Sequence, residues 1–543
     1  MKRTVSVLIL AAALAGRTAW AGMQDRSIPH FVRENGRYAL MVDDAPFLVL
    51  GAQVNNSSGW PTVLPKVWPA LEFLHANTVE IPVYWEQFEP EEGVFDPSSV
   101  DALLSQARVH GMRLVLLWFG TWKNGSQHYM PAWMKLQPER YTRVVDSEGQ
   151  VLDSPSPFAE ASLAADTAAF GALMRHLREA DPQRTVIMVQ VENESGTWGT
   201  ERDHCPAANK LFQAPVPAEV LKAMNVKVGA SDPDWQHAFG PDAEVFFHAW
   251  AVATYIGKVA AAGKAAYPLP LYANAALRDV MTPGAPGTYQ SGGPLDNVIP
   301  IWKVAAPALD MVCPDDYETD TAAYTKVLDL YRRDDNPLYV PETGGSPRFF
   351  FFVLGRQGLG FSPFGIDFTR VRTLDDPARP ADGDLSPWAR TGTREFAAPF
   401  EPIYRVMAPM ARAVAALNFA GRLQSVAERP GETVQTLGFG DWDATVSYGV
   451  WARYGKPAGN PKPMGGVMIA RLEDGRFLVT GFHARVDFHP AEPGRRRQFL
   501  RVEEGIFEGG AFKLLRLLNG DQTDGGLDFH AEPLVLRISL ARY

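Results

Sequence analysis

The stretch Val186-Ile-Met-Val-Gln-Val191, with Glu192-Asn-Glu194 directly after it, decides the fold class of this chain. Its first six residues carry no charge and are mostly β-branched or long aliphatic side chains, which predicts a strand. A strand that is apolar along its whole length is buried on both faces, as strands of parallel sheets are. We therefore expect a parallel sheet covered by helices.

Seven similar runs flank this strand, and amphipathic helical patterns lie between them. The eight expected strands are Phe47–Gln53, Thr78–Pro82, Arg113–Trp118, Val186–Val191, Leu269–Ala273, Asp310–Cys313, Leu338–Pro341 and Gly358–Phe361. The expected helices include Val67–His75, Val100–His110, one capped by Asp166 and ending near Glu179, and Val245–Ala262. Such alternation predicts a (β/α)₈ barrel. A doubly wound open sheet would need a Gly-rich phosphate turn after its first strand, and the polar run Asn55–Ser58 stands there instead.

The pattern changes after about Leu417 to alternating strands separated by turns. These strands are Thr433–Leu437, Ala444–Tyr448, Gly466–Arg471, Arg476–Thr480 and Leu534–Ile538. Period-2 alternation is typical of antiparallel sheets with one buried face. We expect a catalytic barrel over residues 22–422 and an antiparallel β-sandwich-like domain over residues 423–543.

The N-terminus has the features of a signal peptide. Lys2 and Arg3 precede an apolar core, Val5–Ala15, and Ala19-Trp-Ala21 provides small residues at a cleavage point before Gly22. Residues 1–21 are therefore interpreted as a leader, and the protein as periplasmic or secreted. The alternative is a disordered or helical N-terminus of a cytosolic protein. By inspection, no later stretch is long and apolar enough to cross a membrane, so no membrane association is expected after cleavage.

The composition narrows the function classes. Of the 543 residues 46% are hydrophobic and 21% charged, which excludes wholesale disorder. The net charge is -10 and no Lys/Arg-rich run occurs, so nucleic acid is not an expected partner. Two cysteines, Cys205 and Cys313, exclude a disulfide scaffold; free thiols are preferred over a pair.

Other catalytic signatures are missing from the sequence. There is no zinc spacing, metalloprotease motif, Gly-x-Ser-x-Gly elbow or phosphate loop. No metal and no cofactor are therefore expected, and homo-oligomer formation is left open.

Two glutamates stand out because of where they occur. Glu194 follows the fourth expected strand and Glu342 follows the seventh, so both should lie at the carboxyl-terminal mouth of a barrel. A pair of facing carboxyl groups is what glycoside hydrolysis needs, one as acid and one as nucleophile. Asn193, beside the acid, is placed to bond the sugar hydroxyl next to the anomeric centre.

Alternatives to this pair remain. A lone strand-end Glu is more often a salt-bridge partner or cap, and Glu192 is a rival acid that more plausibly supports the site from behind. Reserve carboxylates at expected strand ends are Glu86, Glu89, Asp315 and Asp316.

Aromatic residues crowd the same strand ends, as a carbohydrate cleft requires, since sugar C–H faces stack on flat rings. They are Trp85, Trp118, Trp122, Trp133, Trp198, Tyr317 and Phe361. Phe361 belongs to Gly358–Gly365, a segment expected to form a cleft wall. Core packing is the alternative for any single one.

Three segments resemble glycoside hydrolase family 35, the β-galactosidases, whose members are retaining (β/α)₈ enzymes. They are Ala76–Asp96, Pro131-Ala-Trp133 and Gln190–Gly196, and the likeness covers most of residues 35–370. The segment Arg516–Leu527 is similar to the β-rich tail of one bacterial branch of these enzymes. The resemblance implies Glu194 as acid/base and Glu342 as nucleophile. Clan relatives imply that Tyr317 hydrogen-bonds the nucleophile and that Asn274 binds a sugar hydroxyl.

The chain departs from this family at three places. The family usually has a sugar-binding Tyr on strand two, at a position near Pro82 of this chain. Tyr84 is the nearest candidate here. The third-strand loop Phe119–Gly125 lacks the usual Glu, so Lys123 and Asn124 are candidates for the missing hydroxyl contacts. The aromatic residues usual after the nucleophile are absent.

The sequence thus predicts an exported retaining β-glycosidase, foremost a β-galactosidase acting on oligo- or polysaccharides. Alternatives are another clan activity (β-glucosidase, β-mannosidase or endo-glucanase) and a non-catalytic carbohydrate-binding protein. The C-terminal domain is expected to stabilise the barrel, with polysaccharide binding as its alternative role.

Overall fold

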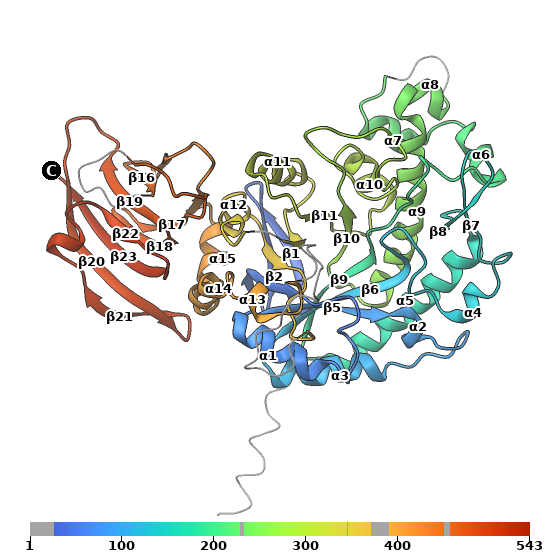
Figure 1. Ribbon diagram of the computed structural model, residues 1–543, viewed down its shortest axis with the longest axis horizontal. Helices are drawn as coiled ribbons and strands as arrows, with labels where there is room; N and C mark the ends of the chain where they lie inside the picture. Colours follow the sequence, from blue (N-terminus) through green and yellow to red (C-terminus); the bar gives the residue numbers. More distant parts are fainter. Residues whose placement is uncertain (1–26, 228–232, 345, 371–389, 450–456) are drawn as a thin grey trace, which may run out of the picture.

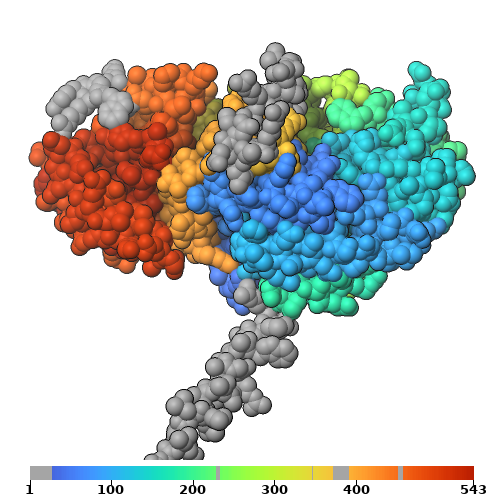
Figure 2. Space-filling model, turned by 60° about the horizontal axis from the view of Figure 1, so that its bottom comes forward, coloured from blue at the N-terminus to red at the C-terminus, as the bar shows by residue number. Residues whose placement is uncertain are grey.

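The structure is a computed structural model that describes residues 27–227, 233–344, 346–370, 390–449 and 457–543. The expected leader, residues 1–21, lies outside the described residues. Two bodies lie side by side along the long axis, a barrel and a pair of β-sheets (Figures 1 and 2).

A closed parallel barrel of eight strands forms the first body, which confirms the predicted fold class. Its strands in order around the barrel are β4 (Val49–Gln53), β5 (Thr78–Tyr84), β6 (Arg113–Lys123), β9 (Val186–Asn193), β10 (Leu271–Ala276), β11 (Met311–Asp316), β12 (Val340–Thr343) and β13 (Gly360–Pro363). Each corresponds to one of the apolar runs in the sequence. Almost every residue in them is buried, because the interior is filled by side chains and helices cover the outside.

Helices surround the barrel on its outer side (Figure 1). The longer ones are α1 (Leu64–Leu74), α3 (Ser98–Val109), α5 (Glu160–Ala180), α9 (Ala243–Ala266) and α11 (Thr321–Tyr331). The shorter ones are α2 (Trp85–Phe88), α4 (Ala132–Lys135), α6 (Pro206–Phe212), α7 (Ala218–Ala223), α8 (Trp235–Phe239), α10 (Ile299–Ala305), α12 (Phe349–Gly355), α13 (Arg394–Ala397), α14 (Glu401–Met407) and α15 (Ala411–Phe419).

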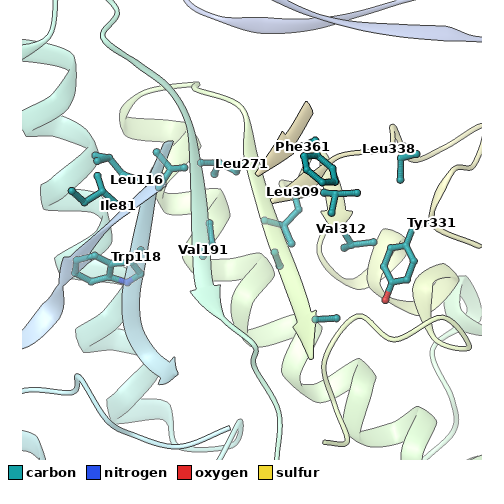
Figure 3. Packing of buried hydrophobic residues seen from close by; sticks show 14 of the residues in the cluster. Ile81, Leu116, Trp118, Val191, Leu271, Leu309, Val312, Tyr331, Leu338 and Phe361 are labelled. Atoms are coloured by element: carbon teal, nitrogen blue, oxygen red, sulfur yellow. The ribbon is translucent and has the colours of Figure 1, made fainter. Parts of the chain in front are cut away.

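The apolar side chains between strands and helices form one large core, of which Figure 3 shows a part. Ile81, Leu116 and Val191 lie on three successive barrel strands, and their side chains fill the layer under the helices. Single three-turn helices such as α1 and α11 are marginal in water, so this shared burial is what holds them.

Asp166 corrects one prediction. It is not a helix cap, because α5 begins six residues earlier at Glu160. Its buried carboxylate accepts hydrogen bonds from Trp118 Nε1 (2.9 Å) and Thr121 Oγ1 (2.7 Å) on β6. A cap residue and a buried acceptor share the same side-chain type, so sequence did not separate the two.

One described helical segment, Trp235–Ala266, is long and apolar enough to span a membrane by those two criteria alone. Its most apolar window is 72% buried inside the protein. In the structure its main part, α9, packs against α5 and α10 in the outer layer of the barrel. This is the pattern of a core helix.

A small antiparallel sheet precedes the barrel. It consists of β1 (His30–Glu34), β2 (Arg37–Val42) and β3 (Ala45–Phe47). Leu40 and Val42 pack with barrel residues such as Val115 and Ile187. A two-stranded ribbon, β7 (Arg143–Val145) and β8 (Val151–Pro155), lies in the loop after β6.

The second body contains two antiparallel sheets that face each other. The larger has the order β14 (Leu423–Ala427), β17 (Gly466–Glu473), β18 (Arg476–Phe482), β23 (Leu534–Arg542), β20 (Arg497–Glu508) and β21 (Ala511–Leu517). The smaller contains β15 (Val434–Gly438), β16 (Trp442–Tyr448), β19 (Ala484–Pro490) and β22 (Leu527–Phe529). Trp442, Phe477 and Phe488 lie in the apolar core between them.

The two bodies share a close-packed contact. Helix α12, which follows barrel strand β12, packs on β14 and β17 of the larger sheet. A Cβ placed on Gly466 would lie 2.5 Å from the Phe351 ring, and one on Gly355 would lie 2.2 Å from the Ser425 carbonyl oxygen. No larger side chain fits at either glycine without moving one body away from the other.

Cys205 and Cys313 are both free, and Cys313 is buried in β11.

Candidate active site

Glu194 and Glu342 lie together at the mouth of the barrel. Glu194 follows β9 directly, and Glu342 is the third residue of β12. A carboxylate oxygen of each lies within 4.8 Å of the other, and an oxygen of Asp315 lies within the same distance of both. All three side chains line a cavity of about 600 Å³.

The backbone around Glu194 is held in an uncommon conformation. Glu192 (φ 63°) and Glu194 (φ 43°) are both in the left-handed region, which non-glycine residues seldom adopt. Asn274 Oδ1 accepts from the Glu194 backbone N–H at 2.9 Å, and Gly125 N–H donates to the Glu194 carbonyl at 2.9 Å. Gln290 also donates to that carbonyl. These bonds hold the turn that directs the Glu194 side chain into the cavity.

Two donors hold Glu342. Gln53 Nε2 donates to Oε2 at 2.6 Å, and the Tyr317 hydroxyl donates to Oε1 at 2.5 Å. A carboxylate can only accept, so both partners suit an ionised Glu342. Gln53 is the last residue of β4 and Tyr317 comes just after β11, so strands from both sides of β12 orient this one carboxylate.

Glu194 is surrounded by groups that favour its protonated form. Burial and then the neighbouring charge of Glu342 raise its pKa to about 7, against the lowering effects of Lys123 and of a hydrogen bond from Asp315. The site therefore presents an ionised carboxylate beside a carboxyl group that retains its proton up to about neutral pH. This is the arrangement for one nucleophile and one acid.

Three more predicted residues lie around the same carboxyls. Lys123 and Asn124 line the cavity, and a register shift in the pairing of β6 with β9 sets Lys123 opposite Asn193. Lys123 Nζ donates to Asn193 Oδ1 at 3.1 Å. The other end of the Asn193 amide, Nδ2, is buried without a partner among the described residues. Asn193 itself is fully buried and is not one of the residues that line the cavity.

Asn274 is close to the site but has a different environment from the one expected. Its Oδ1 accepts from Glu194 and its Nδ2 donates to Asp315 Oδ2 at 2.6 Å. Each end of the amide is bonded within the protein, and Asn274 is not one of the residues that line the cavity, so its contacts are those of a residue that positions neighbouring groups.

Three predicted binding residues do not reach the cavity. Trp122 packs edge-on against Tyr255 of α9, and Phe361 packs against Phe350 and Phe400 in the helix layer. Tyr84 is buried beneath the loop after β4, where its hydroxyl accepts the Gly59 backbone N–H at 2.9 Å. Successive residues of a strand point to opposite sides. A shift of one residue along the strand therefore decides whether a ring near its end faces the barrel mouth or the core.

The cavity also contains residues that sequence reasoning missed. They are Asn55, Asn56, Ala276, Leu277, Glu318, Arg370 and Thr391; Phe364 also lines the cavity and belongs to Gly358–Gly365, the segment expected to form a cleft wall. The polar run after the first strand was a usable signal for Asn55 and Asn56. Its loop is held by buried Asp367, which accepts from the Asn55 backbone N–H (2.9 Å) and from Ser58 Oγ (2.8 Å).

One reserve carboxylate, Asp315, lines the cavity, whereas the others and the rival Glu192 have structural contacts. Glu192 accepts the Trp122 backbone N–H at 2.6 Å, and burial together with the charge of Asp166 raises the pKa of Glu192 well above its usual value. Glu89 accepts from Trp85 Nε1 at 2.7 Å, and Asp316 accepts from the Glu318 N–H at 3.1 Å. Glu86 is partly exposed beside Lys135.

Among the described residues, Glu194, Asp315 and Glu342 are also the one acidic group compact enough to hold a metal ion. Gln53 and Tyr317 already donate to both oxygens of Glu342, and Lys123 Nζ is a competing cation at the same end of the cavity. The donor set suits hydrogen bonding better than metal binding.

Comparison with known proteins places only part of the chain in a family. Residues 400–530 match a domain of unknown function, DUF5597. No curated protein matches the sequence.

Among solved structures, the chain is similar to a cold-adapted β-galactosidase from Rahnella sp. R3 (16% identity, TM-score 0.46, covering 68% of this chain and 58% of that one). It is also similar to a β-galactosidase from the psychrophilic Marinomonas ef1 (12%, 0.46, 69% and 62%) and to a family 39 glycoside hydrolase from Bacteroides cellulosilyticus WH2 (12%, 0.42, 94% and 87%). The matches thus span less than two thirds of the two β-galactosidases. Similarity at this level does not separate one activity from another, so the side chains in the barrel mouth must decide the function.

Proposed function

We propose that the protein is a retaining β-glycosidase, with Glu342 as nucleophile and Glu194 as acid/base. The observation that carries this proposal is that one carboxyl oxygen of Glu194 lies within 4.8 Å of one carboxyl oxygen of Glu342, at the ends of β9 and β12. Retaining enzymes hold the two carboxyls about 5–5.5 Å apart, whereas inverting enzymes leave about 6.5–9.5 Å for a water molecule. The distance here favours direct attack by one carboxylate.

The chemistry then runs in two steps. In the first, a Glu342 oxygen bonds to the anomeric carbon, the bond to the leaving-group oxygen breaks, and Glu194 gives that oxygen its proton. In the second, Glu194 takes a proton from water, the water oxygen bonds to the anomeric carbon, and the ester bond to Glu342 breaks. Because Glu342 has no charge in the intermediate, the pKa of Glu194 falls at that stage and Glu194 becomes a base.

The sugar would be oriented by the polar groups around this pair. Nδ2 of Asn193, which is next to Glu194 in sequence, is a buried donor without a partner among the described residues, and Lys123 and Asn124 line the cavity. We expect them to bond hydroxyls near the anomeric centre, where such bonds strengthen in the transition state. Leu277 and Phe364 offer apolar surface on the cavity wall for the C–H face of a sugar.

Galactose is our proposed glycone, on the resemblance of three sequence segments to family 35. β-Glucosidase, β-mannosidase and endo-glucanase activities are the alternatives, since the third-strand loop lacks the family's Glu. The deciding experiment measures nitrophenol release from a panel of nitrophenyl β-glycosides. Fastest cleavage of the galactoside supports the proposal, and fastest cleavage of another glycoside replaces the glycone while the mechanism stands.

Glu342→Gly tests the mechanism. Without its nucleophile the enzyme should lose at least about 10³-fold in kcat, and added azide should restore turnover by forming a glycosyl azide of inverted configuration. Wild-type protein that cleaves no glycoside yet binds sugars by calorimetry would instead support a non-catalytic carbohydrate-binding protein.

We also propose that the protein is exported, on the basic and apolar character of residues 1–21. Mass spectrometry of protein expressed in a bacterium with an outer membrane should find a periplasmic or secreted chain that begins at Gly22. A cytoplasmic chain that keeps Met1 contradicts the proposal.

A further inference from the structure

The orientation of the Asn274 amide determines what Asp315 can do. The Glu194 backbone N–H is a donor, so the Asn274 atom 2.9 Å from it must be the oxygen. The other end of the amide is therefore the NH₂ group, and it donates to Asp315 Oδ2 at 2.6 Å. Oδ2 of Asp315 is thus an acceptor, and a proton on this carboxyl group would have to be on Oδ1.

Asp315 Oδ1 is buried and accepts no hydrogen bond among the described residues. Asp315 is only 3% exposed, and an oxygen of both Glu194 and Glu342 lies within 4.8 Å of it. An ionised carboxylate would leave a charged oxygen without a donor beside two other carboxyls, which is a costly arrangement. A protonated Oδ1 removes this cost, because it becomes a donor, and the Glu194 carboxyl group, which interacts with the Asp315 side chain and has an oxygen within 4.8 Å of it, can accept.

We infer that Asp315 is a positioning residue for the proposed acid/base: it carries a proton on Oδ1 and donates a hydrogen bond to the Glu194 carboxyl group. The inference rests on the proposed role of Glu194. The charged and titratable groups around Asp315 are Glu342 on β12, Glu194 after β9, Lys123 on β6, Tyr317 after β11, Cys313 on β11 itself, Tyr272 on β10 and Tyr331 on α11. Burial first, then the charges of Glu342 and Glu194, raise the pKa of Asp315 well above its usual value, while Lys123 and the Asn274 bond oppose this.

This hydrogen bond has a use in both steps of the reaction. When Glu194 gives up its proton it becomes a carboxylate, and a neutral donor bonds a carboxylate more strongly than a carboxyl group. Asp315 therefore stabilises the ionised Glu194 of the glycosyl-enzyme and holds it in place for the second step. The hydrogen bonds form a closed ring that runs from the Glu194 backbone through Asn274 and Asp315 to the Glu194 side chain. The end of β11 thereby holds the acid/base that follows β9.

Asp315→Asn and Asp315→Ala separate a neutral Asp315 from an ionised one. An Asn can donate to Glu194 and accept from Asn274 as the neutral acid does, so we expect kcat within about tenfold of wild type and the basic limb of the kcat/KM profile to stay in place. Ala removes the donor, so kcat should fall about 10²-fold and the basic limb should move to higher pH. If Asp315 were ionised, Asn would remove a negative charge next to Glu194 and shift the basic limb to lower pH, which would overturn the inference.

A second measurement does not depend on activity. A buried Asp with a raised pKa contributes stability below its unfolded pKa of about 3.9 and loses it as the pH rises toward the folded pKa. Asn does not titrate, so the Tm of Asp315→Asn minus that of wild type should increase from pH 4 to pH 8. A difference that stays constant with pH would refute a neutral Asp315 even if no glycoside is cleaved. Asp316→Asn, at the adjacent residue outside the three-carboxyl cluster, is the matched control for the kinetic measurement and should leave the basic limb unchanged; it is not a control for the Tm, because burial raises the pKa of Asp316 as well.

Discussion

Glu194 must carry a proton to act as an acid, and its surroundings decide the pH range in which it does. Burial and the Glu342 charge raise its pKa to about 7, so the acid form is lost as the pH rises through that value. We expect kcat/KM on a nitrophenyl glycoside to fall about tenfold per pH unit on the basic side of neutrality. Glu194→Gln, which cannot ionise, should show a low rate without this limb. A wild-type rate that stays constant to pH 9 would contradict the assignment of Glu194.

Lys123 is the last residue of strand β6, and the shape of this strand end depends on Gly120. A Cβ at this position would lie 2.4 Å from Trp118 Nε1 and 2.6 Å from Glu192 Oε1, both in fully buried side chains. Gly120→Ala should therefore cost about 1–3 kcal/mol by overpacking and lower kcat about tenfold by displacing the β6 end. Thermal unfolding and kinetics on the same preparation measure both effects.

Gly171→Ala is the control for Gly120→Ala. Gly171 lies in the interior of α5, where an added Cβ would have only the flexible Arg175 side chain within 4 Å, at 3.4 Å. Gly171→Ala should leave kcat unchanged and raise stability slightly, since Ala favours helix by up to about 1 kcal/mol. Equal losses in both variants would mean that Gly120 has no special link to the site.

For the whole molecule, the contact between the barrel and the sandwich rests on the phenylalanines of α12. The Phe351 ring lies 5.5 Å from the rings of Phe350 and Phe482 and closes over Gly466. Phe351→Ala should cost about 3–5 kcal/mol and lower the Tm, because neither body can collapse to fill the cavity. Val109→Ala, at a residue 79% exposed on α3, should stay within about 0.5 kcal/mol of wild type.

The same contact bears on what the sandwich does. If its role is to stabilise the barrel, Phe351→Ala assayed well below its Tm should cleave nitrophenyl glycosides at nearly the wild-type rate. A selective loss of binding to polysaccharide, with normal stability, would favour the polysaccharide-binding role instead.

The sequence by itself determined the eight barrel strands, their order and the two glutamates that follow β9 and belong to β12. It could do so because each strand is a local apolar run and because parallel strands end at one mouth of a barrel, whatever the distance between them in the chain. Only the tertiary structure decided which way individual side chains point. Trp122 and Phe361 turned out to face the helix layer, since one residue of register reverses the side of a strand. The link between Asn274 and Asp315 likewise joins two neighbouring strands, β10 and β11, and no local pattern in the sequence encodes their register against each other.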